Sequence, residues 1–420
     1  MAANELETRI EALVADIAHR GVCLPTEPPM VRPEHPMWTA FTRLGTELWL
    51  DTGDMDDAER LWSAEFSALT TNNTLLSKEV GKGIYDGLIK SAAAELRALG
   101  DGVDNELIVR EVGLVLNAHH GLRLVEKFGA QVSVELHTGL ADDLDGSLAA
   151  GRRLFAMCPS HFIVKVPLTP TGILVARRLV LESIPVNFTL EFSARQNYVV
   201  ARLANPDYVN VFLGRLNAFV GDHGLGDGRM VGEKATLASQ RELLALRSQG
   251  GRTRQIAASL REPGQLVSLA GVDVFTMPIP VAEGMVALTH SPDELRVQVN
   301  KDPSISITPE TEPAVLEALW SVPEELRASV GALVREDLDT FSGEDLADFF
   351  RVRGHGDIFP KWTTADLDHI AADGKIPSYE RWRNAFESFE VGLDAALNVA
   401  GMASFALDQA TLDDRIRTFL

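Results

Sequence analysis

A lysine lies inside one of the most apolar segments of the chain. Lys165 follows Phe162-Ile163-Val164 and precedes Val166-Pro167, a context from which a charged ammonium is normally excluded. Burial disfavours the charged form of a lysine, and the neutral amine is a nucleophile that can form a Schiff base with a carbonyl substrate. The alternative is a structural lysine paired with a buried carboxylate, and the segment alone favours neither interpretation.

Carboxylates end two other apolar runs. Asp51 follows Leu48-Trp49-Leu50, and Glu135 follows Val132-Ser133-Val134. Taken singly, each is more simply explained as a helix cap or a structural partner than as a general acid or base. Burying three ionisable side chains inside one barrel costs several kcal/mol for each of them, unless they pair with one another or belong to a functional site. A shared site therefore explains the set better.

Polar side chains in and after the apolar runs that follow Lys165 could bind a phosphorylated polyol. Asn187 and Thr189 lie two residues apart, so an extended strand puts both on one face, where an amide and a hydroxyl could hold sugar hydroxyls. Arg215 and Arg261 follow two further runs, at positions where barrels commonly bind phosphate. Either arginine alone could instead form a surface ion pair.

Eight short apolar runs, several of them followed by helix-like stretches, would position these side chains. They are Leu48–Asp51, Ser67–Thr71, Val132–Glu135, Phe162–Val166, Val186–Leu190, Val209–Leu213, Arg254–Ser259 and Val272–Thr276. Alternating strand and helix signals predict a parallel sheet, and eight units favour a closed (β/α)8 TIM barrel of the α/β class. In that fold the interrupting polar residues lie at the active-site end of the strands.

The chain is expected to fall into three parts. Residues 1–44 hold a leading helix and a proline-rich connector, residues 45–290 form the barrel, and residues 291–420 form a helical C-terminal extension whose last helix packs on the barrel. Within the extension, helical patterns cover Glu310–Trp320, Glu324–Glu336, Gly343–Phe350, Thr364–Ala372 and Tyr379–Phe419.

The composition of the chain argues against several classes of binding partner. The 420 residues include 39 Lys and Arg against 60 Asp and Glu, a formal charge of −21, so nucleic acid and acidic membranes are poor candidates. Two cysteines are too few for a disulfide framework or a zinc site, and no apolar stretch is long enough to span a membrane. His119 and His120 are adjacent on an expected helix and point apart, which is poor geometry for one metal. We expect a cytoplasmic protein without a metal or cofactor.

The ordered motifs resemble the transaldolase family. The matching segments are, in chain order, Leu50-Asp51-Thr52-Gly53-Asp54, Thr70-Thr71-Asn72, Val134-Glu135, Val164-Lys165-Val166-Pro167, Asn187-Phe188-Thr189-Leu190, Phe212-Leu213-Gly214-Arg215 and Ala258-Ser259-Leu260-Arg261. The closing Phe405-Ala406-Leu407-Asp408-Gln409 is similar to the family's C-terminal helix. Seven motifs in the family's order are specific, although no single motif is decisive.

The resemblance implies a metal-independent Schiff-base mechanism. Lys165 would form the imine with the ketose, and Asp51 would take the proton of the C4 hydroxyl as the C3–C4 bond breaks. Glu135 and Thr189 match the pair that moves protons through a water molecule during imine formation. The implied reaction converts sedoheptulose 7-phosphate and glyceraldehyde 3-phosphate into erythrose 4-phosphate and fructose 6-phosphate, in the pentose phosphate pathway.

The same resemblance implies a set of substrate-binding residues. They are Asn72, Asn187, Asn210, Phe212, Arg215, Ser259 and Arg261. The two amides Asn72 and Asn187 would hold sugar hydroxyls, and Ser259 with the two arginines would hold the phosphate. The related fructose 6-phosphate aldolases resemble a smaller barrel with Gln and Tyr where this chain has Glu135 and Phe212. A tyrosine hydroxyl can aid release of the enamine, so phenylalanine favours transfer over cleavage.

Three positions depart from the family's pattern. Asn73 replaces the proline after Thr-Thr-Asn, Asn210 stands where a serine usually contacts the dihydroxyacetone part, and Glu191 occupies an apolar position. By alternation Glu191 shares a face with Thr189 and could contact substrate or pair with an arginine. An outward salt bridge at a strand end is at least as good an explanation.

Two alternatives to a transaldolase remain. One is a fructose 6-phosphate aldolase-like enzyme or a relative acting on a different sugar, which would differ in releasing free dihydroxyacetone or in its donor. The other is a noncatalytic sugar-phosphate-binding protein, which would need no buried amine. Phosphorylated sugars are the expected partners in each case, and the chain could be a monomer or a homodimer.

Overall fold

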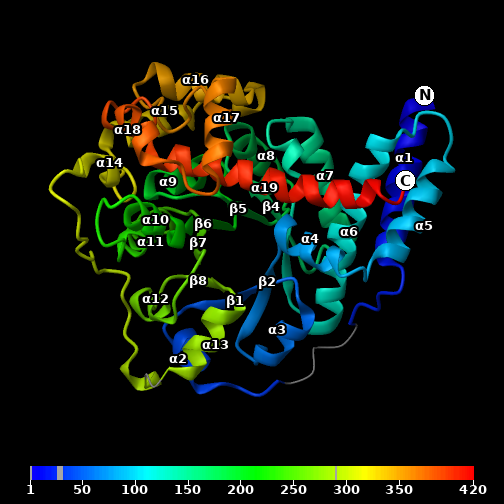
Figure 1. Ribbon diagram of the computed structural model, residues 1–420, viewed down its shortest axis with the longest axis horizontal. Coiled ribbons are helices and arrows are strands. Elements are labelled where there is room, and N and C mark those ends of the chain that lie inside the picture. The colour runs from blue at the N-terminus through cyan, green and yellow to red at the C-terminus, as the bar shows by residue number, and fades with distance from the viewer. Residues whose placement is uncertain (1, 26–31, 289–290) are drawn as a thin grey trace.

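Eight parallel strands close into a barrel in chain order, β1 to β8 (Figure 1). The computed structural model describes residues 2–25, 32–288 and 291–420. The strands are β1 (Glu47–Asp51), β2 (Phe66–Thr70), β3 (Gln131–Glu135), β4 (Phe162–Pro167), β5 (Val186–Thr189), β6 (Tyr208–Phe212), β7 (Arg254–Ala258) and β8 (Val274–Met277). All eight strands predicted from the apolar runs are present, and the α/β barrel fold is confirmed.

Helices follow or separate the strands. They are α1 (Ala2–His19), α2 (Pro36–Arg43), α3 (Met55–Leu61), α4 (Asn73–Gly81), α5 (Asp86–Arg97), α6 (Asn105–Phe128), η1 (Thr138–Leu140), α7 (Leu144–Met157), α8 (Pro170–Leu181), α9 (Ala194–Leu203), α10 (Leu213–Asp222), α11 (Val231–Arg247), α12 (Pro263–Ser268) and α13 (Ile279–Ala287). The extension holds η2 (Pro292–Glu294), α14 (Pro313–Glu317), α15 (Glu324–Leu333), η3 (Leu338–Thr340), α16 (Gly343–Val352), α17 (Thr364–Asp373), α18 (Tyr379–Glu387) and α19 (Leu393–Arg417). The described helices include none that is long and apolar enough to cross a membrane.

Strand alternation separates the barrel interior from the helical layer. Side chains from several strands, two of them from β7, form an interior cluster: Trp49, Ala68, Ile163, Tyr208, Ile256, Ala258 and Val274. Phe162, Val164 and Val166, the other face of β4, belong to the larger core that includes the helices. Lys165 therefore points into the barrel one step beyond Ile163, towards the carboxyl ends of the strands.

The C-terminal helix α19 lies across the barrel. Figure 1 shows it running from the helices of the extension towards α6 and α1, and it contacts α4, α6 and α17. The Asn398 side chain donates to the carbonyls of Leu168 and Leu190, 3.0 and 2.8 Å away. These carbonyls follow β4 and β5 directly, so α19 is hydrogen-bonded to the strand ends that carry Lys165 and Thr189.

The pattern over Tyr379–Phe419 predicts one helical stretch, which the structure divides into α18 and α19 with a break at 388–392. The break places Asp394 against the barrel. Its carboxylate accepts hydrogen bonds from Arg195 at 2.7 and 2.8 Å and from Ser193 at 2.6 Å, and Arg195 also pairs with Asp357 at 2.6 Å. This buried cluster fastens the extension to α9.

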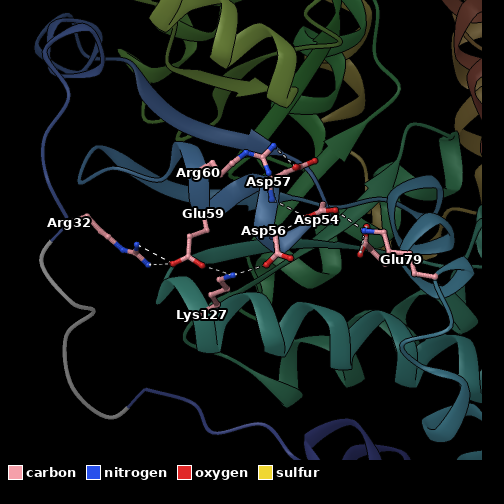
Figure 2. A network of polar contacts seen from close by, with 9 residues as sticks. Arg32, Asp54, Asp56, Asp57, Glu59, Arg60, Glu79 and Lys127 are labelled. Carbon is pink, nitrogen blue, oxygen red and sulfur yellow. Dashed lines mark hydrogen bonds and ion pairs between the residues drawn. The ribbon is translucent and has the colours of Figure 1, made fainter.

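Charged side chains surround the segment that follows β1 (Figure 2). Asp54 caps α3 by accepting from the N–H groups of Asp56 and Asp57, and Lys82 donates to it at 2.7 Å. Lys127 of α6 pairs with Glu59 of α3 at 2.6 Å. The cap at the start of α3 is thus Asp54, which leaves Asp51, the last residue of β1, outside the capping interaction.

Candidate active site

Lys165 lies beside Glu135 in the barrel. The two are register partners on β4 and β3, and the lysine Nζ is 3.4 Å from Glu135 Oε1. Nζ also donates to the Thr71 carbonyl at 3.3 Å. Both side chains are almost fully buried, with 4% and 3% exposed. The structure brings the two groups together inside the barrel, and their proximity fits both a shared site and the structural pairing considered above.

Glu135 has one satisfied oxygen and one free oxygen. Its Oε2 accepts the backbone N–H of Asn73 at 3.0 Å. Its Oε1 faces Lys165 without a hydrogen bond, and Thr189 Oγ1 is likewise buried without a partner in the described part of the chain. Thr189 lies at the end of β5, beside β4. Buried polar atoms normally have a hydrogen-bond partner, so these two oxygens are candidates for contact with a bound molecule.

Asp51 lies at the end of β1 and is half-buried. Burial raises the pKa of its carboxyl above the ordinary value, and the nearby positive charges of Lys165 and Arg261 oppose this shift. Glu135 raises the pKa further by like-charge repulsion. The charges of Lys165, Arg261 and Glu135 therefore all act on the Asp51 carboxyl, as expected if these groups belong to one site.

The amides of the site are bound to one another. Asn187 donates to Ser133 Oγ and accepts from Asn210 Nδ2, both at 2.9 Å, and Asn210 also donates to the Phe188 carbonyl. Asn187 is the register partner of Lys165 on β5, so this network lies at the level of the amine. Asn72 lies between Thr71 and Asn73, whose backbone groups contact Lys165 and Glu135, and its side-chain oxygen caps α4 by accepting the Leu75 N–H at 2.8 Å.

Arg215 lies in the first turn of α10, and this turn packs against the segment after β7 that carries Arg261. Gly214 allows the close approach, because a Cβ there would be 2.1 Å from the Ser259 carbonyl oxygen and 2.9 Å from Arg261 Cγ. Ser259 itself has a φ of 60°, the left-handed conformation. Arg215 is buried while Arg261 is exposed, and each begins within three residues of a strand end.

Arg215 is a buried cation that forms no ion pair with the described residues. Burial and the positive charge of Arg261 lower its pKa to about 10, with partial opposition from Asp408. Its Nη1 has no hydrogen-bond partner in the ranges described. The guanidinium lies over the rings of Phe212 and Phe405, 5.5 and 5.9 Å from their centroids. A buried guanidinium beside a second arginine, with no ion pair to a carboxylate of the described residues, suits a phosphate.

Phe405 is a site residue that the sequence reasoning did not assign. It projects from α19, and its ring centroid lies 5.9 Å from both the Lys165 Nζ and the Arg215 guanidinium. The motif around it was noticed as a likeness to a C-terminal helix, but helix periodicity does not show that its ring reaches the barrel interior.

A cavity of about 710 Å³ adjoins the site from outside the barrel. Asn73, Asn117 and Glu135 line it, together with residues of α6, α7 and α19 such as Arg153 and Asp413. Glu135 therefore lies between the barrel interior and this outer space. The described residues include no group of three or more His, Cys, Asp or Glu side chains arranged to hold a metal.

Comparison with known proteins shows the family of this chain. The sequence profile of the Transaldolase/Fructose-6-phosphate aldolase family matches residues 48–348. A probable transaldolase of Thermus thermophilus is 33% identical over 238 residues, 55% of this chain and 86% of that protein. A transaldolase of Xanthomonas oryzae pv. oryzae is 30% identical over 243 residues, 56% of this chain and 74% of that protein. The chain belongs to the Transaldolase/Fructose-6-phosphate aldolase family.

Proposed function

We propose that this protein is a transaldolase that moves a dihydroxyacetone unit from a phosphorylated ketose to a phosphorylated aldose. The observation that carries the proposal is the buried pair of Lys165 and Glu135, 3.4 Å apart, with oxygens that lack a hydrogen bond on Glu135 and on Thr189 of the neighbouring strand. Burying an amine and two oxygens without completing their hydrogen bonds is costly unless a ligand completes them.

The first half of the reaction uses these three side chains. The lone pair of the Lys165 amine attacks the ketose C2, and the carbonyl oxygen takes up a proton to give a carbinolamine. Glu135 and Thr189, through a water molecule, supply the proton with which the hydroxyl departs as water and leaves the protonated imine.

Asp51 then breaks the carbon skeleton. Its carboxylate takes the proton of the C4 hydroxyl, the C3–C4 bond electrons move into the protonated imine, and the shortened aldose leaves. A three-carbon enamine stays on Lys165. An incoming aldose adds to it by the reverse steps, and hydrolysis of the new imine restores the amine.

Arg215 and Arg261 would hold the phosphate of donor and acceptor. The buried guanidinium of Arg215 lacks a counter-ion in the part of the chain that the structure describes, and a phosphate would supply one. The substrates proposed are sedoheptulose 7-phosphate with glyceraldehyde 3-phosphate, and fructose 6-phosphate with erythrose 4-phosphate, as in the pentose phosphate pathway of the cytoplasm.

A fructose 6-phosphate aldolase is the second candidate, since the family includes both activities. Phe212 supports transfer, because its ring lies against Phe192 and Arg215 and carries no hydroxyl that could protonate the enamine.

Borohydride trapping with fructose 6-phosphate, followed by peptide mass mapping, tests the proposal. A three-carbon adduct on Lys165 is expected, and erythrose 4-phosphate added before the borohydride should remove it. Lys165→Ala and Lys165→Arg should form no adduct and have no activity, because an arginine keeps its charge and cannot act as the nucleophile. Near-normal turnover by either variant would refute the Schiff-base mechanism, and steady release of free dihydroxyacetone without an acceptor would favour the aldolase.

A further inference from the structure

A buried carboxylate that the proposed mechanism does not use links the two segments that carry the arginines. Glu233 lies in the first turn of α11 with 3% of its surface exposed. Its Oε2 accepts a hydrogen bond from the Asn217 side chain and its Oε1 accepts one from the Gln265 side chain, both at 3.0 Å. Asn217 lies on α10, two residues after Arg215, and Gln265 lies on α12, four residues after Arg261. Glu233 is therefore bonded to both segments.

Each of the two amides holds a backbone N–H with its oxygen and Glu233 with its nitrogen. Gln265 Oε1 accepts the N–H of Arg261 at 2.7 Å. Asn217 Oδ1 accepts the N–H of Gly232, in the first turn of α11, at 2.8 Å. Because backbone donors occupy the amide oxygens, both amides present their NH2 groups to Glu233. Only a side chain with two acceptor oxygens satisfies both of these groups, and a carboxylate has them.

The backbones of the same segments approach each other closely. Helices α10 and α11 pack together beside β6 and β7 (Figure 1). A Cβ on Gly232 would be 2.2 Å from the Leu213 carbonyl oxygen, so the start of α11 lies directly on the start of α10. Gly214 packs in the same way against the Ser259 carbonyl. The hydrogen bonds of Glu233 thus lie in a tightly packed corner, where they tie α10 to the segment after β7.

Glu191 is another fully buried glutamate, and it forms no such link. It lies just past the end of β5 with 0% of its surface exposed, and it forms no ion pair with the described residues. The pairing with an arginine and the outward salt bridge considered from the sequence are therefore both wrong. Glu233 differs because each of its oxygens is bound to a segment that carries a proposed phosphate ligand.

We propose that Glu233 is a positioning residue that fixes the spacing of Arg215 and Arg261 and thereby sets the preference of the enzyme for phosphorylated sugars. The inference rests on the proposed function, in which the two guanidinium groups hold the substrate phosphate. Glu233 acts through Asn217 and Gln265 rather than by contact with substrate. Two guanidinium groups repel each other until a phosphate lies between them, so bonds that hold their backbones in place beforehand lower the cost of binding.

The experiment exchanges the carboxylate and the amide of one hydrogen bond. Glu233→Gln puts an NH2 group opposite the NH2 group of Asn217 or Gln265, so one of the two hydrogen bonds is lost. The double variant Glu233→Gln with Gln265→Glu restores it. The new carboxylate accepts the backbone N–H groups with one oxygen and the new amide with the other, while the oxygen of that amide accepts from Asn217.

Gln265→Ala and Gln240→Ala form a matched pair of test and control. Both glutamines are buried and bind a carboxylate, and Gln240 lies on α11, seven residues after Glu233. Gln240 donates to the Asp273 carboxylate and accepts its backbone N–H, both at 2.9 Å. Asp273 directly precedes β8, so this contact lies at the amino ends of the strands, opposite the arginines. Gln240→Ala should therefore affect stability alone.

The readout is the ratio of kcat/KM for fructose 6-phosphate to kcat/KM for unphosphorylated fructose, with glyceraldehyde as a fixed acceptor. Glu233→Gln and Gln265→Ala should lower this ratio about tenfold through a higher KM for fructose 6-phosphate, the factor expected for one hydrogen bond. The double variant should recover most of the ratio, and Gln240→Ala should match wild type. The affinity for inorganic phosphate, measured by calorimetric titration, should follow the same order.

An unchanged ratio and an unchanged phosphate affinity in Glu233→Gln and Gln265→Ala, with borohydride adducts still forming on Lys165, would overturn the positioning role and leave the proposed function standing. An equal loss in Gln240→Ala, or no recovery in the double variant, would also overturn it. If wild type forms no adduct on Lys165 with a phosphorylated ketose, the proposed function fails, and the phosphate titrations alone decide on Glu233. If Glu233→Gln does not fold, Gln265→Ala decides, and its equality with wild type overturns the inference.

Discussion

The backbone N–H of Asn73 donates a hydrogen bond to Glu135 Oε2 over 3.0 Å. Asn73 is the first residue of α4, and it stands where the resembled Thr-Thr-Asn-Pro motif has a proline. Proline has no N–H, so this chain holds Glu135 by a bond that the usual residue could not make. The Asn73 side chain adds to the link, since it donates to the Leu136 carbonyl and accepts from Asn117.

Asn73→Pro should remove that bond with little damage to the fold. Proline is favoured at the first position of a helix, and Asn72 before it is extended, as a residue preceding proline prefers. We expect slower imine formation, about tenfold by the strength of a hydrogen bond to a charged group, and a shifted pH profile. Rapid-quench borohydride trapping from pH 5 to 9 measures both. Asn73→Ala keeps the backbone N–H and is the control. Equal trapping rates and equal pH profiles in wild type and Asn73→Pro would show that this hydrogen bond does not position Glu135.

Asp51→Asn should separate activity from stability. Because burial raises the pKa of Asp51, cleavage by the wild type should fall as the pH drops through a value above that of an ordinary aspartate. The pKa of Asp51 is higher in the folded protein than in the unfolded chain. The contribution of this carboxyl to the free energy of unfolding is therefore fully present below its unfolded pKa and is lost as the pH rises through its folded pKa. At pH 7 Asp51→Asn should thus be at least as stable as wild type in urea, yet inactive. Lower stability of this variant at pH 7 would contradict the sign of the shift.

Arg215→Met should stabilise the protein and weaken phosphate binding. With a pKa of about 10 the guanidinium is charged at neutral pH, and it is buried without an ion pair among the described residues. Methionine removes that cost. We expect the Tm of the variant without ligand to equal or exceed that of wild type. Inorganic phosphate should raise the Tm of wild type but not that of the variant. The KM for fructose 6-phosphate should rise at least about tenfold. The exposed Arg335→Met is the control. A phosphate response equal to that of wild type would exclude Arg215 from the phosphate site.

Asp394→Ala should loosen the extension from the barrel. The change leaves Arg195 buried with one carboxylate partner fewer, and breaking a buried pair costs about 3–5 kcal/mol. Urea unfolding should show this loss. Glu182→Ala, which breaks the exposed pair with Arg152, should cost less than about 1 kcal/mol. Similar losses in the two variants would mean that the Asp394 cluster does not hold α19 in place.

Asp54→Ala should show what the cap of α3 contributes. The hydrogen bond from Lys82 and the N–H groups of Asp57 and Asp56 lower the pKa of Asp54 to about 2 (Figure 2). A lowered carboxyl pKa adds stability above the unfolded value, and this is lost as the pH falls from about 4 towards 2. The variant should lose about 1 kcal/mol at pH 7, a usual value for a cap, and the difference from wild type should shrink near pH 2. A constant difference from pH 7 to 2 would contradict the assignment.

The sequence by itself determined the barrel and the inward direction of its chemical groups. Apolar runs interrupted by one polar residue and followed by helical patterns specify parallel strands covered by helices, and strand alternation then fixes which side chains point inward. This is why Lys165, Glu135 and Asn187 could be assigned to one interior before any coordinates, and the strand register indeed places them side by side. The ordered motifs likewise indicated the family.

The tertiary structure decided which groups meet across long stretches of chain. Phe405 lies 240 positions from Lys165 in the sequence. The Asn73 N–H that binds Glu135 comes from a different strand-to-helix turn. Neither contact can therefore be recognised from a local sequence pattern. Glu191 shows the limit best. Alternation assigned its face, but Leu190 turns the backbone out of the strand conformation, and the full burial of Glu191 arises where the ends of β5 and β6 and helix α19 come together. Periodicity reports the direction of a side chain, whereas its partners depend on closure of the whole barrel.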